Sequence, residues 1–190
     1  MTDPFLLMTP VLALAVFALA RFVGCELVFQ LKDVPPEIPF VESTVLGEPR
    51  SDFTGWVGMV IVVGPNPITV TDLGRSTFAA SAATHEVKLV LPAGTSGTDL
   101  GTVTIPASAV IQGYAYAPLQ PSVVLQANTE YYVVSHETNG GDRWFDFPTV
   151  VTTTGVASVT SGVFNDDANL AGYVLQPGAN RTYVPVNFRY

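Results

Sequence analysis

Short stretches of alternating polar and apolar residues, separated by turn residues, run through most of this chain, which is the pattern of antiparallel β-strands. Residues 68–75 (ITVTDLGR) begin with strict alternation, so Ile68 and Val70 are predicted to face a core. The run at 53–63 (FTGWVGMVIVV) is predicted to be a buried strand that ends at the turn 64–67 (GPNP). Further strands are predicted at 86–91, 102–105, 111–117, 122–125, 130–136, 149–154, 157–164 and 183–190, with a loop at 92–97.

Strands of this length, with a turn about every ten residues, are typical of β-sandwiches and jelly rolls. A parallel α/β fold would need helical patterns between its strands, and none is found after residue 80. We therefore predict a mainly β fold, a jelly-roll-like antiparallel β-sandwich, preceded by one N-terminal hydrophobic α-helix.

That helix is predicted from residues 4–24 (PFLLMTPVLALAVFALARFVG), which are apolar apart from Thr9 and Arg21. Thr9 followed by Pro10 is a favourable helix start. A helix from Pro10 to about residue 31 has roughly 22 residues and a length of about 33 Å, enough to cross a bilayer core. Because one domain of about 150 residues cannot bury such a helix, residues 1–32 are predicted to be a membrane anchor or an assembly core.

Cys25 raises the alternative of a lipoprotein signal peptide, because residues 17–25 read FALARFVGC. That alternative is weakened by Phe22, by Arg21, and by residues 1–3, which carry no Lys or Arg. We expect the segment to be retained and Cys25 to be a small buried residue of the helix.

Membrane or assembly contacts are predicted for Pro10, Phe17, Arg21, Cys25 and Glu26. Arg21 can reach a membrane interface or meet Glu26 of an adjacent helix. Arg21 and Lys32 both follow the apolar span, which by the positive-inside rule favours a cytoplasmic C-terminal side. This conflicts with an exported β-domain, although two charges are a weak signal.

The remainder of the chain is predicted to be a linker and one domain. Residues 33–51 (DVPPEIPFVESTVLGEPRS) contain four prolines and scattered acids, which predicts an extended connector before a β-sandwich at 52–190. The chain has 16 acidic and 8 basic residues and a net charge of -8, which excludes nucleic acid as a partner. Its single cysteine excludes an intrachain disulfide, so packing must stabilise the domain.

Four segments resemble bacterial surface-protein β-sandwich modules catalogued as a domain of unknown function: GMVIVVGPNPITVTDLGR, THEVKLV, LQANTEYYVVSH and the closing YVPVNFRY. The resemblance spans about residues 53–190. It implies a β-sandwich in a secreted or anchored protein, often beside carbohydrate-active or adhesive domains. It carries no catalytic residues over to this chain.

Direct signs of catalysis are missing from the sequence. His85 and His136, each next to an acid, lack the spacing of a zinc site and are interpreted as polar strand residues near turns. No nucleophile elbow or similar signature accompanies them. We therefore predict that the protein is not an enzyme.

Two oxygen-rich segments are candidates for a structural calcium ion, which takes six to eight oxygen ligands. The candidate ligands are Asp142 and Asp146 in the segment 139–146 (NGGDRWFD), and Asp166 and Asp167 in 165–167 (NDD). There is no full EF-hand pattern. The alternative is that these are solvated turn residues.

Aromatic residues raise the possibility of a sugar-binding platform: Trp56, Tyr114, Tyr116, Tyr131, Tyr132 and Trp144. Core packing is the alternative for these residues, since alternate strand residues face opposite sides and one of Tyr131 and Tyr132 should lie in the core. The candidate contact residues are Trp144, predicted to be exposed in its Gly-Asp loop, together with Arg143 and Tyr132.

Together these features predict a non-enzymatic structural or interaction subunit of the cell envelope, membrane-anchored with a periplasmic or cell-surface β-domain. Its predicted partners are membrane lipids or other protein subunits, contacted through the N-terminal helix within an oligomeric assembly. It would be an accessory subunit of a larger membrane complex or a surface filament subunit. The alternative function is a membrane-anchored glycan-binding module.

Overall fold

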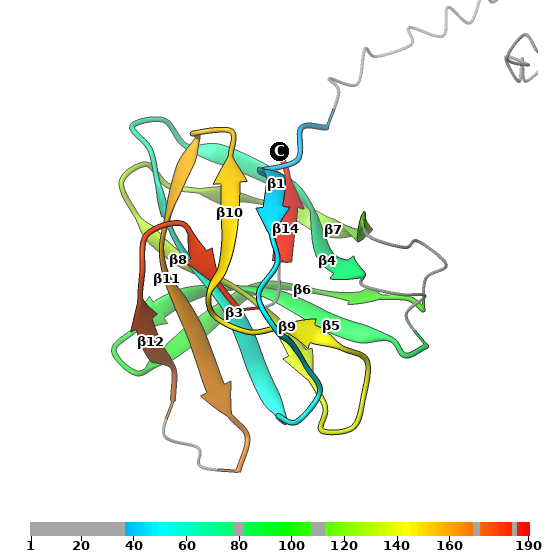
Figure 1. The fold of residues 1–190 in the computed structure, drawn as a ribbon. Helices are drawn as coiled ribbons and strands as arrows, with labels where there is room; N and C mark the ends of the chain where they lie inside the picture. The colour runs from blue at the N-terminus through cyan, green and yellow to red at the C-terminus, as the bar shows by residue number, and fades with distance from the viewer. Residues whose placement is uncertain (1–36, 78–81, 108–112, 169–171, 184–185) are drawn as a thin grey trace, which may run out of the picture. The chain divides into compact units, whose positions relative to one another are not determined.

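The structure is a computed structural model that describes residues 37–77, 82–107, 113–168, 172–183 and 186–190 (Figure 1). Every regular element in this part of the chain is a β-strand. The strands are β1 (Val41–Val45), β2 (Pro49–Arg50), β3 (Gly55–Val63), β4 (Ile68–Thr77), β5 (His85–Ala93), β6 (Ser96–Ile105), β7 (Gly113–Leu125), β8 (Glu130–Glu137), β9 (Trp144–Phe145), β10 (Thr149–Thr153), β11 (Ala157–Asp166), β12 (Val174–Pro177), β13 (Arg181–Thr182) and β14 (Val186–Arg189).

These strands form antiparallel sheets, which confirms the predicted mainly β class. The largest sheet has six strands in the order β12-β11-β3-β8-β5-β6. Two three-stranded sheets, β14-β4-β7 and β1-β10-β13, and the small pair β2-β9 complete the domain. The predicted turn at 64–67 takes the chain from β3 in the six-stranded sheet to β4 in another sheet.

The main core lies between the inner face of the six-stranded sheet and the smaller sheets. Alternate residues of β3, including Met59 and Ile61, pack there against Leu73 of β4 and Phe188 of β14. All four of these side chains have no exposed surface. The predicted inward positions Ile68 and Val70 belong to the same core cluster, so the alternation at the start of β4 is confirmed.

A second apolar cluster covers the outer face of the six-stranded sheet. It consists of Val60, Val90, Tyr132, Val134, Val163 and Tyr173, with Trp56 packed against it. The six-stranded sheet is therefore buried on both faces over part of its area. This explains why 53–63 reads as a continuous hydrophobic run rather than an alternating one.

The predicted linker requires a correction, because most of it belongs to the domain. Phe40 is fully buried, and its ring stacks on that of Phe188 with the centroids 4.5 Å apart. The backbone of Phe40 donates a hydrogen bond to the Phe188 carbonyl over 2.9 Å, and Val41 begins β1, which pairs with β10. Among the described residues, the folded unit therefore already includes 37–51, ahead of the predicted boundary at residue 52.

The buried side chain of Asn187 holds this N-terminal segment in place. Its Oδ1 accepts a hydrogen bond from the Val41 amide over 2.8 Å, and its Nδ2 donates to the Val41 carbonyl over 3.1 Å. These bonds replace a strand ladder between β1 and β14. The polar sequence of β1 (VESTV) hides this long-range pairing, which is why the segment resembles a connector.

The predicted helix at 1–32, with its contact residues Pro10, Phe17, Arg21, Cys25 and Glu26, lies outside the described residues. Within the described ranges, no helix is long and apolar enough to cross a membrane.

Candidate functional site

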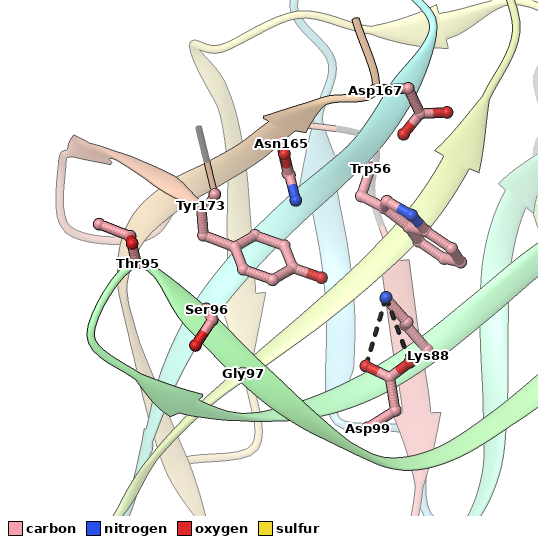
Figure 2. A pocket seen from close by; sticks show the side chains of 10 residues that line it. Trp56, Lys88, Thr95, Ser96, Gly97, Asp99, Asn165, Asp167 and Tyr173 are labelled. Atoms are coloured by element: carbon pink, nitrogen blue, oxygen red, sulfur yellow. Dashed lines mark hydrogen bonds and ion pairs between the residues drawn. The ribbon is translucent and has the colours of Figure 1, made fainter. Parts of the chain in front are cut away.

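A pocket with a volume of about 500 Å³ opens on the outer face of the six-stranded sheet (Figure 2). Its walls come from β3, β5, the β5–β6 hairpin, the end of β11 and the segment before β12. Two aromatic residues, one cation, two carboxylates, one amide, two hydroxyl residues and two glycines line it: Trp56, Tyr173, Lys88, Asp99, Asp167, Asn165, Thr95, Ser96, Gly97 and Gly172. We call this the outer-face pocket.

One wall of the outer-face pocket is built around Trp56. The ammonium group of Lys88 lies 3.9 Å from the centroid of the Trp56 ring, at cation–π distance. The same ammonium lies 3.3 Å from both carboxylate oxygens of Asp99. Lys88 itself is mostly buried, so its stem packs against the wall while its charge is shared between an aromatic face and a carboxylate.

Tyr173 forms the floor of the pocket and packs edge-on against Tyr132, with their ring centroids 5.1 Å apart. Tyr173 is 9% exposed, and its hydroxyl has no hydrogen-bond partner among the described residues. Burial, with the negative charge of Asp99 as a smaller cause, raises the pKa of the Tyr173 phenol well above its ordinary value. A neutral buried hydroxyl without a partner is destabilising.

The position of Tyr173 depends on a close contact between two loops. Its amide donates a hydrogen bond to the Thr95 carbonyl in the β5–β6 hairpin over 2.7 Å. Gly172 has φ +88, and a Cβ there would lie 2.2 Å from the same carbonyl. Only glycine combines this backbone conformation with this approach.

The end of β11 lines the pocket beside Trp56. Asn165 is the register partner of Trp56, so the amide and the indole lie side by side. Asp167 follows and pairs with His136 Nε2 over 2.7 Å, and the His136 ring meets the edge of the Trp56 ring with the centroids 5.0 Å apart. The pocket thus presents polar groups of several kinds beside an aromatic face.

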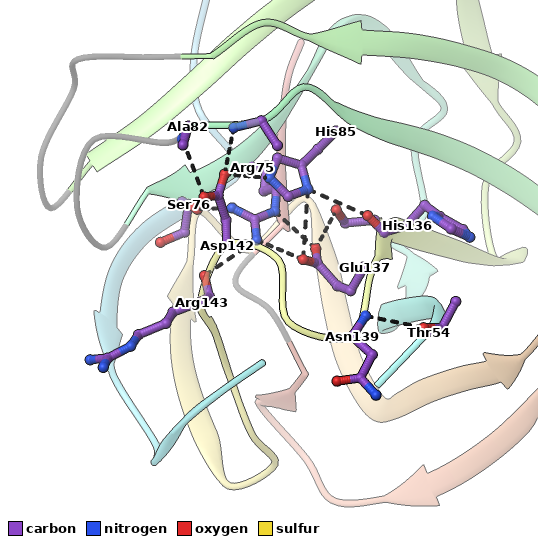
Figure 3. Close-up of polar contacts among 12 residues, drawn as sticks. Thr54, Arg75, Ser76, Ala82, His85, His136, Glu137, Asn139, Asp142 and Arg143 are labelled. Carbon is purple, nitrogen blue, oxygen red and sulfur yellow. Dashed lines mark hydrogen bonds and ion pairs between the residues drawn. The ribbon is translucent and has the colours of Figure 1, made fainter. Parts of the chain in front are cut away.

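A second polar cluster lies where β4, β5 and β8 meet the loop 138–143 (Figure 3). Arg75 and Glu137 are 1% and 0% exposed and form a bidentate ion pair with N···O distances of 2.9 and 2.8 Å. Ser135 donates a further hydrogen bond to Glu137 over 2.7 Å. His85 links this pair to the loop, since its Nε2 lies 3.0 Å from Asp142 Oδ2 and its Nδ1 lies 3.6 Å from Glu137 Oε2.

This cluster connects chain segments rather than surrounding a cavity. Asp142 accepts hydrogen bonds from the amides of Ala82 and Ala83 over 3.2 and 3.0 Å. Arg75 also donates to the Arg143 carbonyl over 3.3 Å. Because the charged side chains of the cluster are engaged with one another or with backbone groups, we interpret it as the structural support of this end of the domain.

The structure does not assemble the predicted calcium site. The Asp142 carboxylate is engaged by His85 and two backbone amides, Asp146 pairs with Arg50 over 3.1 Å, and Asp167 pairs with His136. Asp166 accepts a hydrogen bond from the Ala168 amide over 2.8 Å. Across the described residues, no three His, Cys, Asp or Glu side chains gather into a group that could hold a metal ion.

Two of the three predicted contact residues are buried, which corrects their assignment. Trp144 is 2% exposed because β9 pairs with β2, which places the Arg50 guanidinium 4.9 Å from its ring centroid. Tyr132 and Tyr131 are each 3% exposed and lie in different apolar clusters, on opposite faces of the sheet. Arg143 is exposed, and its side chain points away from the polar cluster (Figure 3).

Sequence reasoning placed Trp56 among the candidate aromatics but missed Lys88 and Tyr173. The sequence could have pointed to Lys88, since it is one of two lysines and interrupts the apolar strand EVKLVL. No local sequence pattern points to Tyr173, because its place in the pocket depends on Thr95 and other residues more than 70 positions away in the sequence.

No family model matches the chain, and no curated protein matches it either. The functional argument therefore proceeds from the geometry of the outer-face pocket.

Proposed function

We propose that the protein is a non-enzymatic saccharide-binding module of the cell envelope. In this proposal a jelly-roll-like β-sandwich displays the outer-face pocket, and the apolar N-terminal segment, residues 1–32, anchors it as a helix in the membrane or in an assembly core. The buried, unpartnered hydroxyl of Tyr173 at the floor of the pocket is the observation that carries the proposal.

The chemistry of the walls supports a saccharide ligand. A pyranose ring has an apolar C–H face, which packs on an aromatic ring, and a rim of hydroxyls that both donate and accept hydrogen bonds. Tyr173 and Trp56, one face of whose ring is covered by the Lys88 ammonium, offer aromatic surface, while Asn165 and Asp167 offer an amide and a carboxylate beside Trp56. Pockets that combine an apolar wall with a few placed polar groups are the usual form of small-molecule sites.

The tethering of the walls supports binding without large rearrangement. Lys88 is fixed between Trp56 and Asp99, and Tyr173 is fixed by its backbone bond to Thr95. A site whose groups are already ordered loses less conformational entropy when a ligand binds.

The test is a screen of full-length protein in a detergent without a sugar headgroup, against a panel of methyl glycosides and oligosaccharides, by ligand-observed NMR. We expect millimolar or tighter binding of at least one saccharide, with loss of binding in the Trp56→Ala variant. The Thr69→Ala variant, altered at an exposed position of β4, should bind like the unmodified protein.

Tyr173→Phe separates a binding role from a structural one. Removing an unpartnered buried hydroxyl should leave the free energy of unfolding unchanged or raise it by roughly 1 kcal/mol. The same change should weaken saccharide binding about fivefold or more, because a ligand hydrogen bond is lost. Unchanged affinity in this variant would show that the hydroxyl does not contact the ligand.

A second candidate is a structural subunit, either of a surface filament or of a larger membrane complex. It is supported by the apolar segment at 4–24 and by three neighbouring exposed apolar side chains, Val45, Leu46 and Val150, which are 72%, 44% and 37% exposed. Val45 lies opposite Val150 where β1 pairs with β10.

Electron microscopy in detergent and after its removal tests the second candidate. Ordered filaments that disappear when residues 10–31 are deleted would support a helix-core polymer. Discrete particles that stay dispersed only with lipid or detergent would support a membrane anchor instead.

A further inference from the structure

We infer that the outer-face pocket selects uncharged saccharides and rejects acidic ones such as uronic acids. This inference rests on the proposed saccharide-binding function and specifies its ligand class. It is carried by the balance of charges around the pocket, which is set by Lys88, Asp99 and Asp167.

The single ammonium group in the pocket wall is already neutralised. Lys88 Nζ lies 3.3 Å from both oxygens of Asp99 and 3.9 Å from the Trp56 ring centroid. An incoming carboxylate would have to compete with Asp99 for this cation. The structure therefore gives an acidic sugar no unpaired cation in the described wall of the pocket.

Asp167, just after β11, adds a second negative charge to the lining of the pocket. It is 44% exposed, and its hydrogen bond to His136 uses Oδ2. With Asp99, which is 52% exposed, it gives the wall two carboxylates against one ammonium. The whole chain carries a net charge of -8, so the wider field also repels anions.

The same groups favour a ligand rich in hydroxyls. Carboxylates only accept hydrogen bonds, and the Asn165 amide both donates and accepts. The Tyr173 hydroxyl can do either. A neutral sugar supplies donors to Asp99 and Asp167 without bringing a like charge, whereas a uronate brings one close to both.

An ammonium-bearing ligand is less favoured by these contacts, because the cation position over Trp56 is held by Lys88 itself. Such a ligand would have to displace a side chain that is only 12% exposed and paired with Asp99. These contacts of Lys88 therefore disfavour an ammonium-bearing ligand relative to an uncharged saccharide.

The experiment compares methyl glucoside and methyl galactoside with the matching methyl glucuronide and methyl galacturonide. Dissociation constants are measured by NMR titration of the full chain at low and at high ionic strength. We expect the acids to bind about tenfold more weakly at low salt, with a smaller ratio in 1 M NaCl.

The charge variant Asp99→Asn/Asp167→Asn should bring the ratio of acid to neutral dissociation constants to one or below, because it also leaves the Lys88 ammonium without its counter-ion. Glu42→Gln/Glu48→Gln is the matched control, since it removes two negative charges at exposed positions that do not line the pocket. The control should keep the tenfold ratio. Using a ratio separates charge repulsion from the hydrogen bonds that the Asn variants also alter.

The outcomes distinguish the two proposals. Equal or tighter binding of the uronides by the unmodified protein would overturn the selectivity while leaving saccharide binding in place. Absence of binding to every neutral and acidic sugar would overturn the proposed function itself.

Discussion

The Lys88 ammonium group lies 3.9 Å from the centroid of the Trp56 indole, so one wall of the outer-face pocket is a lysine held against a tryptophan. Cation–π contacts of this kind are worth about 0.5 to 2 kcal/mol, depending on how far they are desolvated. The contact orders both side chains before any ligand arrives. It also makes Trp56 a natural reporter of the outer-face pocket.

We predict that Trp56 is accessible to small quenchers and that Trp144 is not. Trp56 is half-buried at the pocket wall, whereas Trp144 is 2% exposed beneath Arg50. Acrylamide quenching of the Trp144→Phe variant, which keeps Trp56, should give a Stern–Volmer constant several-fold larger than that of Trp56→Phe. A saccharide that binds the pocket should lower the first constant only.

The segment around Phe40 is predicted to be essential to the fold. Phe40→Ala removes a fully buried ring stacked on Phe188 and should lower the free energy of unfolding by about 3 to 5 kcal/mol. Val45→Ala, at a position that is 72% exposed in the following strand, should change it by less than about 0.5 kcal/mol. Denaturant unfolding measures both. Equal effects would contradict the placement of residues 37–45 inside the domain.

Because Arg75 and Glu137 form a buried ion pair, we predict that substitutions of these two residues change the free energy of unfolding in a strongly non-additive way. Glu137→Gln removes one charge and leaves the Arg75 guanidinium buried without its counter-ion, which should cost about 3 to 5 kcal/mol. The double variant Arg75→Met/Glu137→Leu should cost less than the single one, because no buried charge remains.

Glu37→Gln provides the control for this ion pair, since Glu37 pairs with Arg189 at the surface. Exposed pairs contribute little, so its effect should lie within experimental error. A double-mutant cycle of unfolding free energies, with the single variants Arg75→Met and Glu137→Leu and their combination, gives the coupling of the two residues. Additive losses would refute the interpretation of this cluster as one cooperative support.

Five tyrosines predict a loss of stability at alkaline pH. Burial is the largest cause that raises the pKa values of Tyr114, Tyr116, Tyr132, Tyr173 and Tyr183 above the ordinary value. Above pH 10 the unfolded chain loses phenolic protons that the folded domain keeps, so the folded state binds more protons. Stability is therefore full below about pH 10 and falls as the pH rises towards the folded pKa values.

Unfolding curves at pH 8, 10 and 11 check this dependence. The Tyr173→Phe variant should lose less stability between pH 10 and 11 than the unmodified domain, because one of the five phenols is gone. Identical slopes would contradict the shielding of Tyr173.

The sequence predicts those strands that follow from local residue patterns, and it misses those that depend on pairing between distant segments. The apolar run at 130–136 and the alternation at 68–71 are local patterns, and both became strands. The two-residue strands β2 and β9 are too short to show any period. They exist because Arg50 and Trp144 are register partners across 94 residues of chain, which no local pattern reveals.

The same difference between local patterns and long-range contacts applies to the candidate site. The oxygen-rich loop containing Asp142 looks like a cation site when it is considered alone. In the fold, that carboxylate meets the amides of Ala82 and Ala83 and the ring of His85. Trp144 was predicted to be exposed from its polar neighbours, and β-pairing buried it. Local composition identifies groups capable of binding, but long-range partners decide whether they stay available.

Gly172 gives the sharpest test of how the pocket is built. Gly172→Ala places a Cβ 2.2 Å from the Thr95 carbonyl at φ +88, so the loop must move away from the β5–β6 hairpin. Gly155→Ala is the matched control, with φ +84 and no atom within 4 Å of the added Cβ. Both changes carry the conformational cost of a positive φ, about 1 kcal/mol or more, but only the first adds the clash.

We therefore expect Gly172→Ala to be the more destabilising variant and to shift Tyr173 off the pocket floor. NMR should show perturbed signals at Tyr173 and Trp56 in Gly172→Ala and local changes only in Gly155→Ala. Saccharide affinity should fall in the first variant and be kept in the second. If both variants bind equally, Tyr173 does not need its bond to Thr95 to shape the pocket, and the floor must be held by its packing on Tyr132 instead.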